Sequence, residues 1–481
     1  MRTSPIDPSP TRSPRHACEP EGDPAFLEIG ELAEQMDAGV VAPTGIVSHQ
    51  LDRIARLDGG LRSFVSIAGD EALAAAQSAE TELRAGLRRG PLHGVPIALK
   101  DMFWQAGKGC AAGTTVLRDE IAPRDATVVE RLREAGAIVL GRLQMTEGAY
   151  SDHHPSVVPP INPWHAEYWT GISSSGPAVA VAAGLCFGAL GSDTGGSIRW
   201  PAAATGLTGL KPSWGRISRD GTAALAPSLD HVGTLTRSAA DAGRLFAAIA
   251  GPDPRDPTCL RSQVLLAEGD GISGLRLGID SSSCGGDVHP LVRGVIENAA
   301  ATLDRLGASL RPVAVPDVAA AIADWPDLCA VEAALVHEAT FPSRRSEYGP
   351  VLASVLDRGW AVAATDFHRI QLRRAALRRE FEELFEKIDL LLCPAHPFAP
   401  LSLAAIGTMG EQPELIAALQ RYTVPFDMTG NPTITLPGGW DEKGLPIGFQ
   451  LVAAHERDEL AIRAAIAFQQ VTDWHRRHPA I

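Results

Sequence analysis

The chain lacks several features that mark other classes of protein. It has only seven cysteines in 481 residues, none spaced Cys-x-x-Cys, which excludes a disulfide framework and a cysteine zinc site. It lacks the ~18 consecutive apolar residues that a membrane-spanning helix needs, and its N-terminus has no apolar core of a secretory signal. Lysine and arginine (43) are fewer than aspartate and glutamate (57), and a net charge of −14 argues against a protein that neutralises phosphates. These absences predict a cytoplasmic protein that binds neither nucleic acid nor membrane.

Two features could suggest other functions, but each has a simpler explanation. Residues 369–379 are rich in arginine, yet four glutamates follow at once, so a solvated helix with paired charges is favoured over a binding patch. His153, His154 and His165 lie close in sequence, but no carboxylate or cysteine spacing accompanies them. The sequence therefore predicts no metal ion and no other cofactor.

The rest of the composition predicts one large domain. Residues 1–24 are rich in proline and serine and are expected to be a disordered tail, leaving residues 25–481 as the domain. Helix-like and strand-like patterns alternate, without a linker or an internal repeat. We therefore expect an α/β fold with a central sheet and helices on both faces. Expected helices are 70–88, 126–135, 239–250, 290–306, 317–339, 365–387 and 456–470, and expected strands are 63–67, 95–99, 137–140, 275–279, 309–315, 389–393, 433–436 and 447–452.

The stretch from Gly171 to Lys211 places serines on both sides of an apolar segment. Ser173, Ser174 and Ser175 precede it, and Ser197 follows it, directly after two glycines. The segment itself, residues 178–190, is 13 residues long, too short to cross a bilayer, and is predicted to be a helix packed in the core. The glycines before Ser197 allow backbone N–H groups to approach a ligand closely.

Lys100 ends a short apolar segment that is predicted to be a buried strand. Two interpretations of this lysine are equally supported by the segment alone. Its amine could reach out to solvent, with only the aliphatic stem buried. Alternatively, a desolvated amine would have a pKa lowered by several units and could act as a base.

A serine nucleophile needs a base and a site for the oxyanion of the tetrahedral intermediate. Neither serine cluster matches the Gly-x-Ser-x-Gly turn of α/β-hydrolases, because Ser173 has Ser175 two positions on and Ser197 has Arg199. No aspartate–histidine pair stands out either. What remains is a combination of serine with lysine.

That combination, in this order, resembles the amidase signature family. The most specific match is the run GSDTGGSIR at residues 191–199, and the context of the lysine, PIALKD at residues 96–101, matches as well. Further matches lie at residues 145–147, 162–164, 228–233 and 429–432, so the resemblance covers essentially the whole chain from residue 26. Around the first serine cluster, the residues Ile172, Ser175 and Pro177 differ from those usual in the family.

The resemblance implies a fold with a mixed sheet and a catalytic triad. Ser197 would be the nucleophile, Ser173 a bridging serine joined to its predecessor by a cis peptide, and Lys100 the base. The backbone N–H groups of Thr194, Gly195, Gly196 and Ser197 would form the oxyanion hole. Ser174 would support the site, and Asp193 and Arg199 would brace the nucleophile loop as a charge pair, unless each only caps backbone groups.

The long loop at residues 148–171 is expected to be functional, because loops of this length within a compact domain usually are. Its aromatic residues Tyr150, Trp164 and Trp169 suggest the wall of a substrate pocket, although packing at the surface is the alternative. Met145, just before the loop, is a further candidate for this wall. Such a lining hints at an aryl or hydrophobic acyl group.

Two catalytic hypotheses and one non-catalytic hypothesis remain. The first is an amidohydrolase that cleaves a small-molecule amide, or an ester, to an acid plus ammonia or an amine. The second is a glutaminase-type subunit of a tRNA-dependent amidotransferase, although residues 151–169 do not look like the glutamine-specific loop of such subunits. The third, a binding protein on the same fold, is disfavoured because all three triad positions are intact. The resemblance also suggests a homodimer, but no part of the sequence specifies an interface.

Overall fold

One sheet of eleven strands runs through the described part of the chain. The computed structural model describes residues 23–263, 271–281 and 285–481. The strands are β1 Phe64–Ile67, β2 Pro96–Lys100, β3 Ile138–Leu143, β4 Gly188–Asp193, β5 Thr208–Lys211, β6 His231–Thr236, β7 Arg276–Asp280, β8 Ser309–Val313, β9 Leu390–Pro394, β10 Thr433–Trp440 and β11 Pro446–Ala453. Their order across the sheet is β1-β3-β2-β4-β6-β5-β10-β11-β9-β7-β8.

The sheet is mixed, as predicted. Strand β2 runs parallel to both β3 and β4, and β7 runs parallel to both β8 and β9. The pairs between these two groups, from β4 to β9, are antiparallel. Because β2 and β4 are parallel neighbours, their carboxyl ends meet at one edge of the sheet, which brings Lys100 close to the chain that leaves β4.

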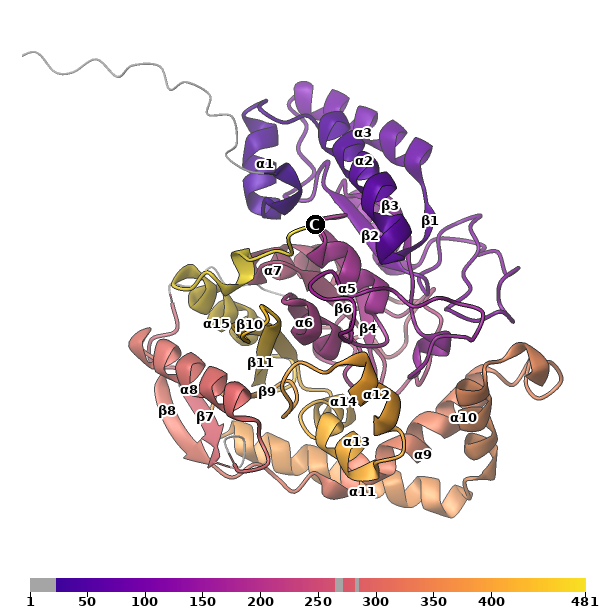
Figure 1. Ribbon diagram of the computed structural model, residues 1–481, viewed down its shortest axis with the longest axis vertical. Coiled ribbons are helices and arrows are strands. Elements are labelled where there is room, and N and C mark those ends of the chain that lie inside the picture. The colour runs from indigo at the N-terminus through magenta and orange to yellow at the C-terminus, as the bar shows by residue number, and fades with distance from the viewer. Residues whose placement is uncertain (1–22, 264–270, 282–284) are drawn as a thin grey trace, which may run out of the picture.

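Helices cover both faces of the sheet (Figure 1). They are α1 Ile29–Asp37, α2 Pro43–Leu61, α3 Gly69–Arg84, α4 Thr127–Glu134, α5 Ser175–Ala182, α6 Arg199–Thr205, α7 Ala239–Ile249, α8 Pro290–Arg305, α9 Ala319–Val336, α10 Pro350–Ala361, α11 Ala364–Phe385, α12 Leu403–Met409, α13 Pro413–Gln420, α14 Val424–Thr429 and α15 Asp458–Gln470. On β4, Gly188 faces Leu245 of α7, whereas Gly191 faces Ser174 at the start of α5. Because side chains alternate along a strand, α5 and α7 lie on opposite faces.

The prediction of one helix over residues 178–190 is wrong in its second half. Helix α5 ends at Ala182, and the chain re-enters the sheet as β4 from Gly188. Gly184 lies between them with a φ of +66°, a conformation that commonly ends helices. The error has a physical cause, since a fully buried strand and a buried helix both appear as an unbroken apolar run.

The predicted elements elsewhere agree with the structure to within a few residues, whereas several short ones were not predicted. Strands β5 and β6 and helices α6, α10, α12, α13 and α14 are among the additions. Most of the predicted tail, residues 1–22, lies outside the described residues. Asp23 and Pro24 are described, and Pro24 begins a short 3₁₀ helix that the Asp23 side chain caps by accepting the Ala25 N–H at 3.0 Å.

Candidate active site

Lys100 is the last residue of β2, and its side chain is completely buried. Its Nζ lies 2.7 Å from Ser173 Oγ, 3.0 Å from Ser174 Oγ and 2.9 Å from Ser192 Oγ. Burial lowers the pKa of the amine to about 7, against the opposing attraction of Asp193 and Asp230. Of the two interpretations of this lysine, the structure therefore supports the buried amine and not the solvent-exposed one.

Ser173 lies two residues before the start of α5. Here the chain passes close to residues 194–198, the loop that carries Ser197 and that we call the nucleophile loop. The peptide bond between Ile172 and Ser173 is cis, the isomer that the resemblance implies. Gly171 has a φ of +76°, and a Cβ there would lie 2.3 Å from the Cα of Pro201 in α6. A glycine is therefore required for the chain to approach α6 this closely before it reaches Ser173.

Ser197 lies on the loop between β4 and α6, at the wall of a cavity of about 500 Å³. Its hydroxyl makes no hydrogen bond within the described part of the chain, to Ser173 or to any other residue. Catalytic hydrogen bonds are often long before substrate binds, so this geometry is compatible with a nucleophile. The Ser174 N–H donates to the Ser197 carbonyl at 3.3 Å, which joins the two serine segments directly.

The backbone N–H groups of the nucleophile loop differ in one respect from the four-donor expectation. The Gly196 N–H already donates to Oδ1 of Asp193 at 2.6 Å. The N–H groups of Thr194, Gly195 and Ser197 make no hydrogen bond to another described residue. Three of the four expected donors are therefore available to a ligand, because the short carboxylate bond occupies the fourth.

Asp193 and Arg199 form a buried ion pair and cap backbone groups as well. The Arg199 Nη2 lies 2.8 Å from Asp193 Oδ1, and neither side chain is exposed to solvent. Asp193 also accepts the Ile198 N–H at 2.9 Å, so the carboxylate shapes the whole turn. Burial by itself would raise the pKa of Asp193, but the Arg199 guanidinium holds it well below its usual range.

Arg199 has a second carboxylate partner that the sequence did not indicate. Its Nη2 lies 2.5 Å from Asp427 Oδ2, and its Nη1 donates to the Thr423 carbonyl at 2.8 Å. Both partners come from the region of α14, more than 220 positions away in sequence. The nucleophile loop is therefore anchored to the C-terminal part of the chain.

The cavity beside Ser197 has a mostly apolar and aromatic lining. Tyr150 and Trp169, two predicted pocket residues, line it. Two other predicted pocket residues do not: Met145 is buried in the main hydrophobic core, and Trp164 lies outside the lining. Residues 151–153 and 159–160 of the long loop form part of the wall. Further lining residues are Ile172, Thr194, Gly195, Trp200, Leu225, Trp325, Leu403, Ile406, Met409, Ile416 and Leu419. No lysine or arginine is among the described residues that line this cavity.

Besides Asp427, sequence reasoning missed Ser192 and Trp325 at the site. Ser192 supplies the third hydroxyl around Lys100, and Trp325 of α9 contacts the nucleophile loop through its indole. Ser192 could have been found from its position beside Asp193 at the end of a strand. Trp325 carries no such signal, because it lies 131 positions from the loop it contacts.

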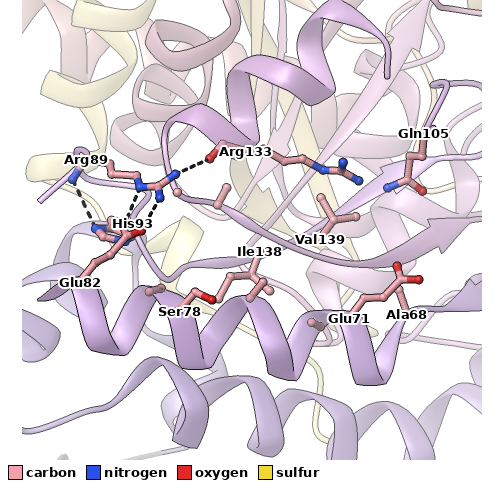
Figure 2. Close-up of a pocket in the computed structure, with 15 residues that line it drawn as sticks. Ala68, Glu71, Ser78, Glu82, Arg89, His93, Gln105, Arg133, Ile138 and Val139 are labelled. Atoms are coloured by element: carbon pink, nitrogen blue, oxygen red, sulfur yellow. Dashed lines mark hydrogen bonds and ion pairs between the residues drawn. The ribbon is translucent and has the colours of Figure 1, made fainter. Parts of the chain in front are cut away.

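A second groove, of about 470 Å³, lies between α3 and β3 and has a different character (Figure 2). Three of its titratable side chains, Glu82, Arg89 and His93, are paired with one another. The Arg89 Nε lies 2.7 Å from Glu82 Oε2, and the His93 Nε2 lies 3.1 Å from the same oxygen. None of the predicted catalytic residues lines this groove, so the cavity at Ser197 is the better candidate.

The described residues contain no group of three or more histidine, cysteine, aspartate or glutamate side chains that could hold a metal ion. His153 instead lies 3.1 Å from Ser175 Oγ, and His154 lies 2.7 Å from Ser156 Oγ. Within the same residues, no helix is both long and apolar enough to span a membrane.

Comparison with known proteins gives a consistent result. The profile of the family named Amidase matches residues 45–462. A Mycobacterium tuberculosis protein named "Putative amidase AmiD" is 42% identical over 460 residues, covering 95% of this chain and 96% of the relative. A Moorella thermoacetica protein, one of the subunits of glutamyl-tRNA(Gln) amidotransferase, is 34% identical over 484 residues, covering 95% of this chain and 99% of the relative. The crystal structure of a bacterial aryl acylamidase of the amidase signature family superimposes with a TM-score of 0.83 at 25% identity, covering 94% of this chain and 98% of that one.

Proposed function

The chain belongs to the amidase family of hydrolases acting on amide C–N bonds, and on that premise we propose that it cleaves its substrate through an acyl-enzyme on Ser197. The observation that carries this proposal is the 2.7 Å contact between the buried Lys100 amine and Ser173 Oγ. A lysine with a pKa of about 7 is about half neutral at neutral pH and largely neutral above it, so it can accept a proton. Ser197 lines the cavity, and its hydroxyl has no hydrogen-bond partner among the described residues.

In the acylation step, the neutral Lys100 amine takes the Ser173 hydroxyl proton while Ser173 takes that of Ser197. The Ser197 oxygen forms a bond to the carbonyl carbon, and the carbonyl π electrons move to its oxygen. The C–N bond then breaks, and Lys100 returns the proton through Ser173 to the leaving nitrogen. In deacylation a water oxygen forms a bond to the acyl carbon while Lys100, through Ser173, takes the water proton. The bond from the acyl carbon to the Ser197 oxygen then breaks, and the proton returns to that oxygen, which releases the acid.

The oxyanion formed in both steps needs hydrogen-bond donors that are already oriented. We assign this role to the N–H groups of Thr194, Gly195 and Ser197, which have no other partner among the described residues. Gly196 keeps its bond to Asp193 and shapes the turn instead. Loss of one such donor typically lowers the rate by about 10²–10³.

We further propose that the acyl group is aryl or otherwise hydrophobic. The cavity at Ser197 has polar lining residues in Asp152, His153 and Gln420, but apolar side chains, including those of tryptophan, leucine, isoleucine and methionine, form most of its wall and favour an apolar ligand. The structural similarity to an aryl acylamidase is compatible with this assignment.

The glutaminase alternative receives less support. Glutamine carries an α-carboxylate, and no lysine or arginine among the described lining residues could pair with it. The identity to the relative named as an amidase, 42%, also exceeds the 34% to the amidotransferase relative. We therefore propose that the protein acts on small amides without a different partner protein. We also propose that it is a homodimer and that it is located in the cytoplasm. Light scattering of the purified protein and cell fractionation test these last two points.

The central experiment combines two substitutions with a covalent probe. Ser197→Ala and Lys100→Ala should each abolish ammonia or amine release from hydrophobic amides, while circular dichroism shows that both variants remain folded. A fluorophosphonate probe should label the wild type at Ser197 and leave Ser197→Ala unlabelled. Wild-type-like turnover in either folded variant would refute the assignment. Glutamine hydrolysis that appears only with a partner chain would support the alternative.

A further inference from the structure

Thr194, the first residue of the nucleophile loop, is held from two directions. Its hydroxyl donates to Asp230 Oδ1 at 2.7 Å, and its carbonyl accepts the Nε1–H of Trp325 at 2.9 Å. Asp230 itself is fixed by the N–H groups of Leu225 and Ala226, at 2.9 and 3.1 Å. All of these groups are buried. The orientation of the Thr194–Gly195 peptide is therefore set by partners outside the loop.

This peptide carries one of the three available oxyanion donors. In a trans peptide unit the C=O and the following N–H lie in one plane and point in opposite directions. When Trp325 holds the Thr194 carbonyl, it also determines the direction of the Gly195 N–H. The indole N–H of Trp325 can thus orient the Gly195 N–H by binding the Thr194 carbonyl, without itself contacting the substrate's oxygen.

The Trp325 ring also contacts the loop through its carbon atoms. A Cβ at Gly195 would lie 2.7 Å from the Cζ2 of Trp325, so the indole packs directly against the Gly195 backbone. Trp325 is only 8% exposed, and its ring stacks on Tyr150 with centroids 6.2 Å apart and planes inclined by 11°. Trp325 and Tyr150 both line the cavity beside Ser197. One side chain therefore belongs both to the wall of the substrate cavity and to the support of the oxyanion loop.

We propose that Trp325 is a positioning residue that holds the Gly195 N–H toward the oxyanion and couples this orientation to the occupancy of the acyl cavity. This inference rests on the proposed function of Ser197. It assigns to the indole N–H a role in transition-state stabilisation, and to the ring a role in binding the acyl group. The two roles can be separated, because phenylalanine keeps an aromatic ring but removes the N–H.

The test compares Trp325→Phe with a matched control. Trp164 donates its Nε1–H to the Thr205 carbonyl at 2.8 Å, but it lies outside the lining of the cavity. Trp325→Phe should lower kcat by about 10- to 100-fold, less than deletion of a direct oxyanion donor, with KM changed less than about threefold. Trp164→Phe loses the same kind of bond elsewhere and should change kcat by less than about twofold.

An inhibitor pair provides a readout that a merely structural role would not change. Trp325→Phe should weaken a trifluoromethyl ketone, which forms an oxyanion on Ser197, by about the same factor as kcat. Its affinity for the carboxylic acid product, which forms no such adduct, should stay near that of the wild type. Equal weakening of both inhibitors, or a rise in KM at unchanged kcat, would overturn the proposal and leave Trp325 as a cavity wall only.

A second variant covers the possibility that Trp325→Phe is poorly folded. Thr194→Val removes the bond to Asp230 but keeps the carbonyl, and Thr194→Ser keeps both. The proposal expects the valine variant to lose kcat and ketone affinity together, and the serine variant to retain both. Unchanged kcat in folded Thr194→Val would count against it. Failure of the proposed function is distinguishable, because then wild-type protein would not hydrolyse amides or Ser197→Ala would remain active.

Discussion

The Lys100 amine and the Ser192 hydroxyl, at the ends of neighbouring parallel strands, lie 2.9 Å apart in the buried centre of the site. With Ser173 and Ser174, Ser192 surrounds the amine with hydroxyl groups, and no carboxylate of the described residues is in contact with it. Hydroxyl groups can solvate either protonation state of an amine, whereas an adjacent carboxylate would favour the ammonium form. Because no carboxylate contacts the amine, burial can lower the pKa of Lys100 to about 7.

The pH dependence of the reaction should follow the titration of Lys100. The amine is the base only when neutral, and its pKa is lowered to about 7, so kcat/KM should rise with pH through that value. Below it, each pH unit should reduce kcat/KM about tenfold. A pH–rate profile on an uncharged amide measures this. An acidic limb near pH 4 would instead point to His153, whose pKa burial lowers to about 4.

Replacing Ser192 should shift the rise of kcat/KM that is expected near pH 7 to a lower pH. The ammonium form of Lys100 donates a hydrogen bond to the Ser192 hydroxyl, and loss of this bond destabilises the charged form. Ser192→Ala should therefore lower the apparent pKa by about one unit, since a hydrogen bond to a charged group contributes about 1.5 kcal/mol or more. Ser192→Thr retains the hydroxyl and should leave the limb in place. A limb that moves upward in folded Ser192→Ala would contradict this account.

Breaking the buried ion pairs of Arg199 with Asp193 and Asp427 should strongly lower the free energy of unfolding. Arg199→Met leaves two buried carboxylates, Asp193 and Asp427, without their cation, and loss of one partner of a buried pair typically costs about 3–5 kcal/mol. Urea unfolding measures the change in the free energy of unfolding. Arg379→Met is the control, because Arg379 pairs with Glu383 on the exposed face of α11, and it should change stability by less than about 1 kcal/mol. Equal effects of the two substitutions would refute the importance of burial here.

Substrate preference should follow the apolar lining of the cavity. Across a series of linear acyl amides, kcat/KM should rise about fourfold per added methylene until the cavity is filled, because burying one CH₂ contributes about 0.8 kcal/mol. Trp169→Ala removes part of the wall and should shift the optimum toward bulkier acyl groups. Trp164→Ala, outside the lining, should leave the optimum unchanged. A preference for acetamide over all larger amides would contradict the assignment.

The local motifs made the fold class predictable, and they singled out the residues of the candidate site. The serine-rich and glycine-rich runs around Ser173 and Ser197 are contiguous, and each can be recognised without knowledge of the fold. The misassigned stretch shows the limit of this reasoning. Residues 178–190 are apolar throughout, and only the positive φ at Gly184 and pairing with β2 and β6 separate α5 from β4.

By itself, the sequence determined which side chains are proposed to carry the chemistry, because Lys100, Ser173 and Ser197 sit in short runs that can be recognised along the chain. Tertiary structure alone decided what surrounds them. The choice between an exposed and a buried lysine depended on the parallel pairing of β2 with β4. The partners of the nucleophile loop, Asp427 and Trp325, come from helices more than 100 positions away. Such contacts follow from packing and leave no local pattern, so the environment that tunes the pKa of Lys100 and orients Gly195 is present only in the folded chain.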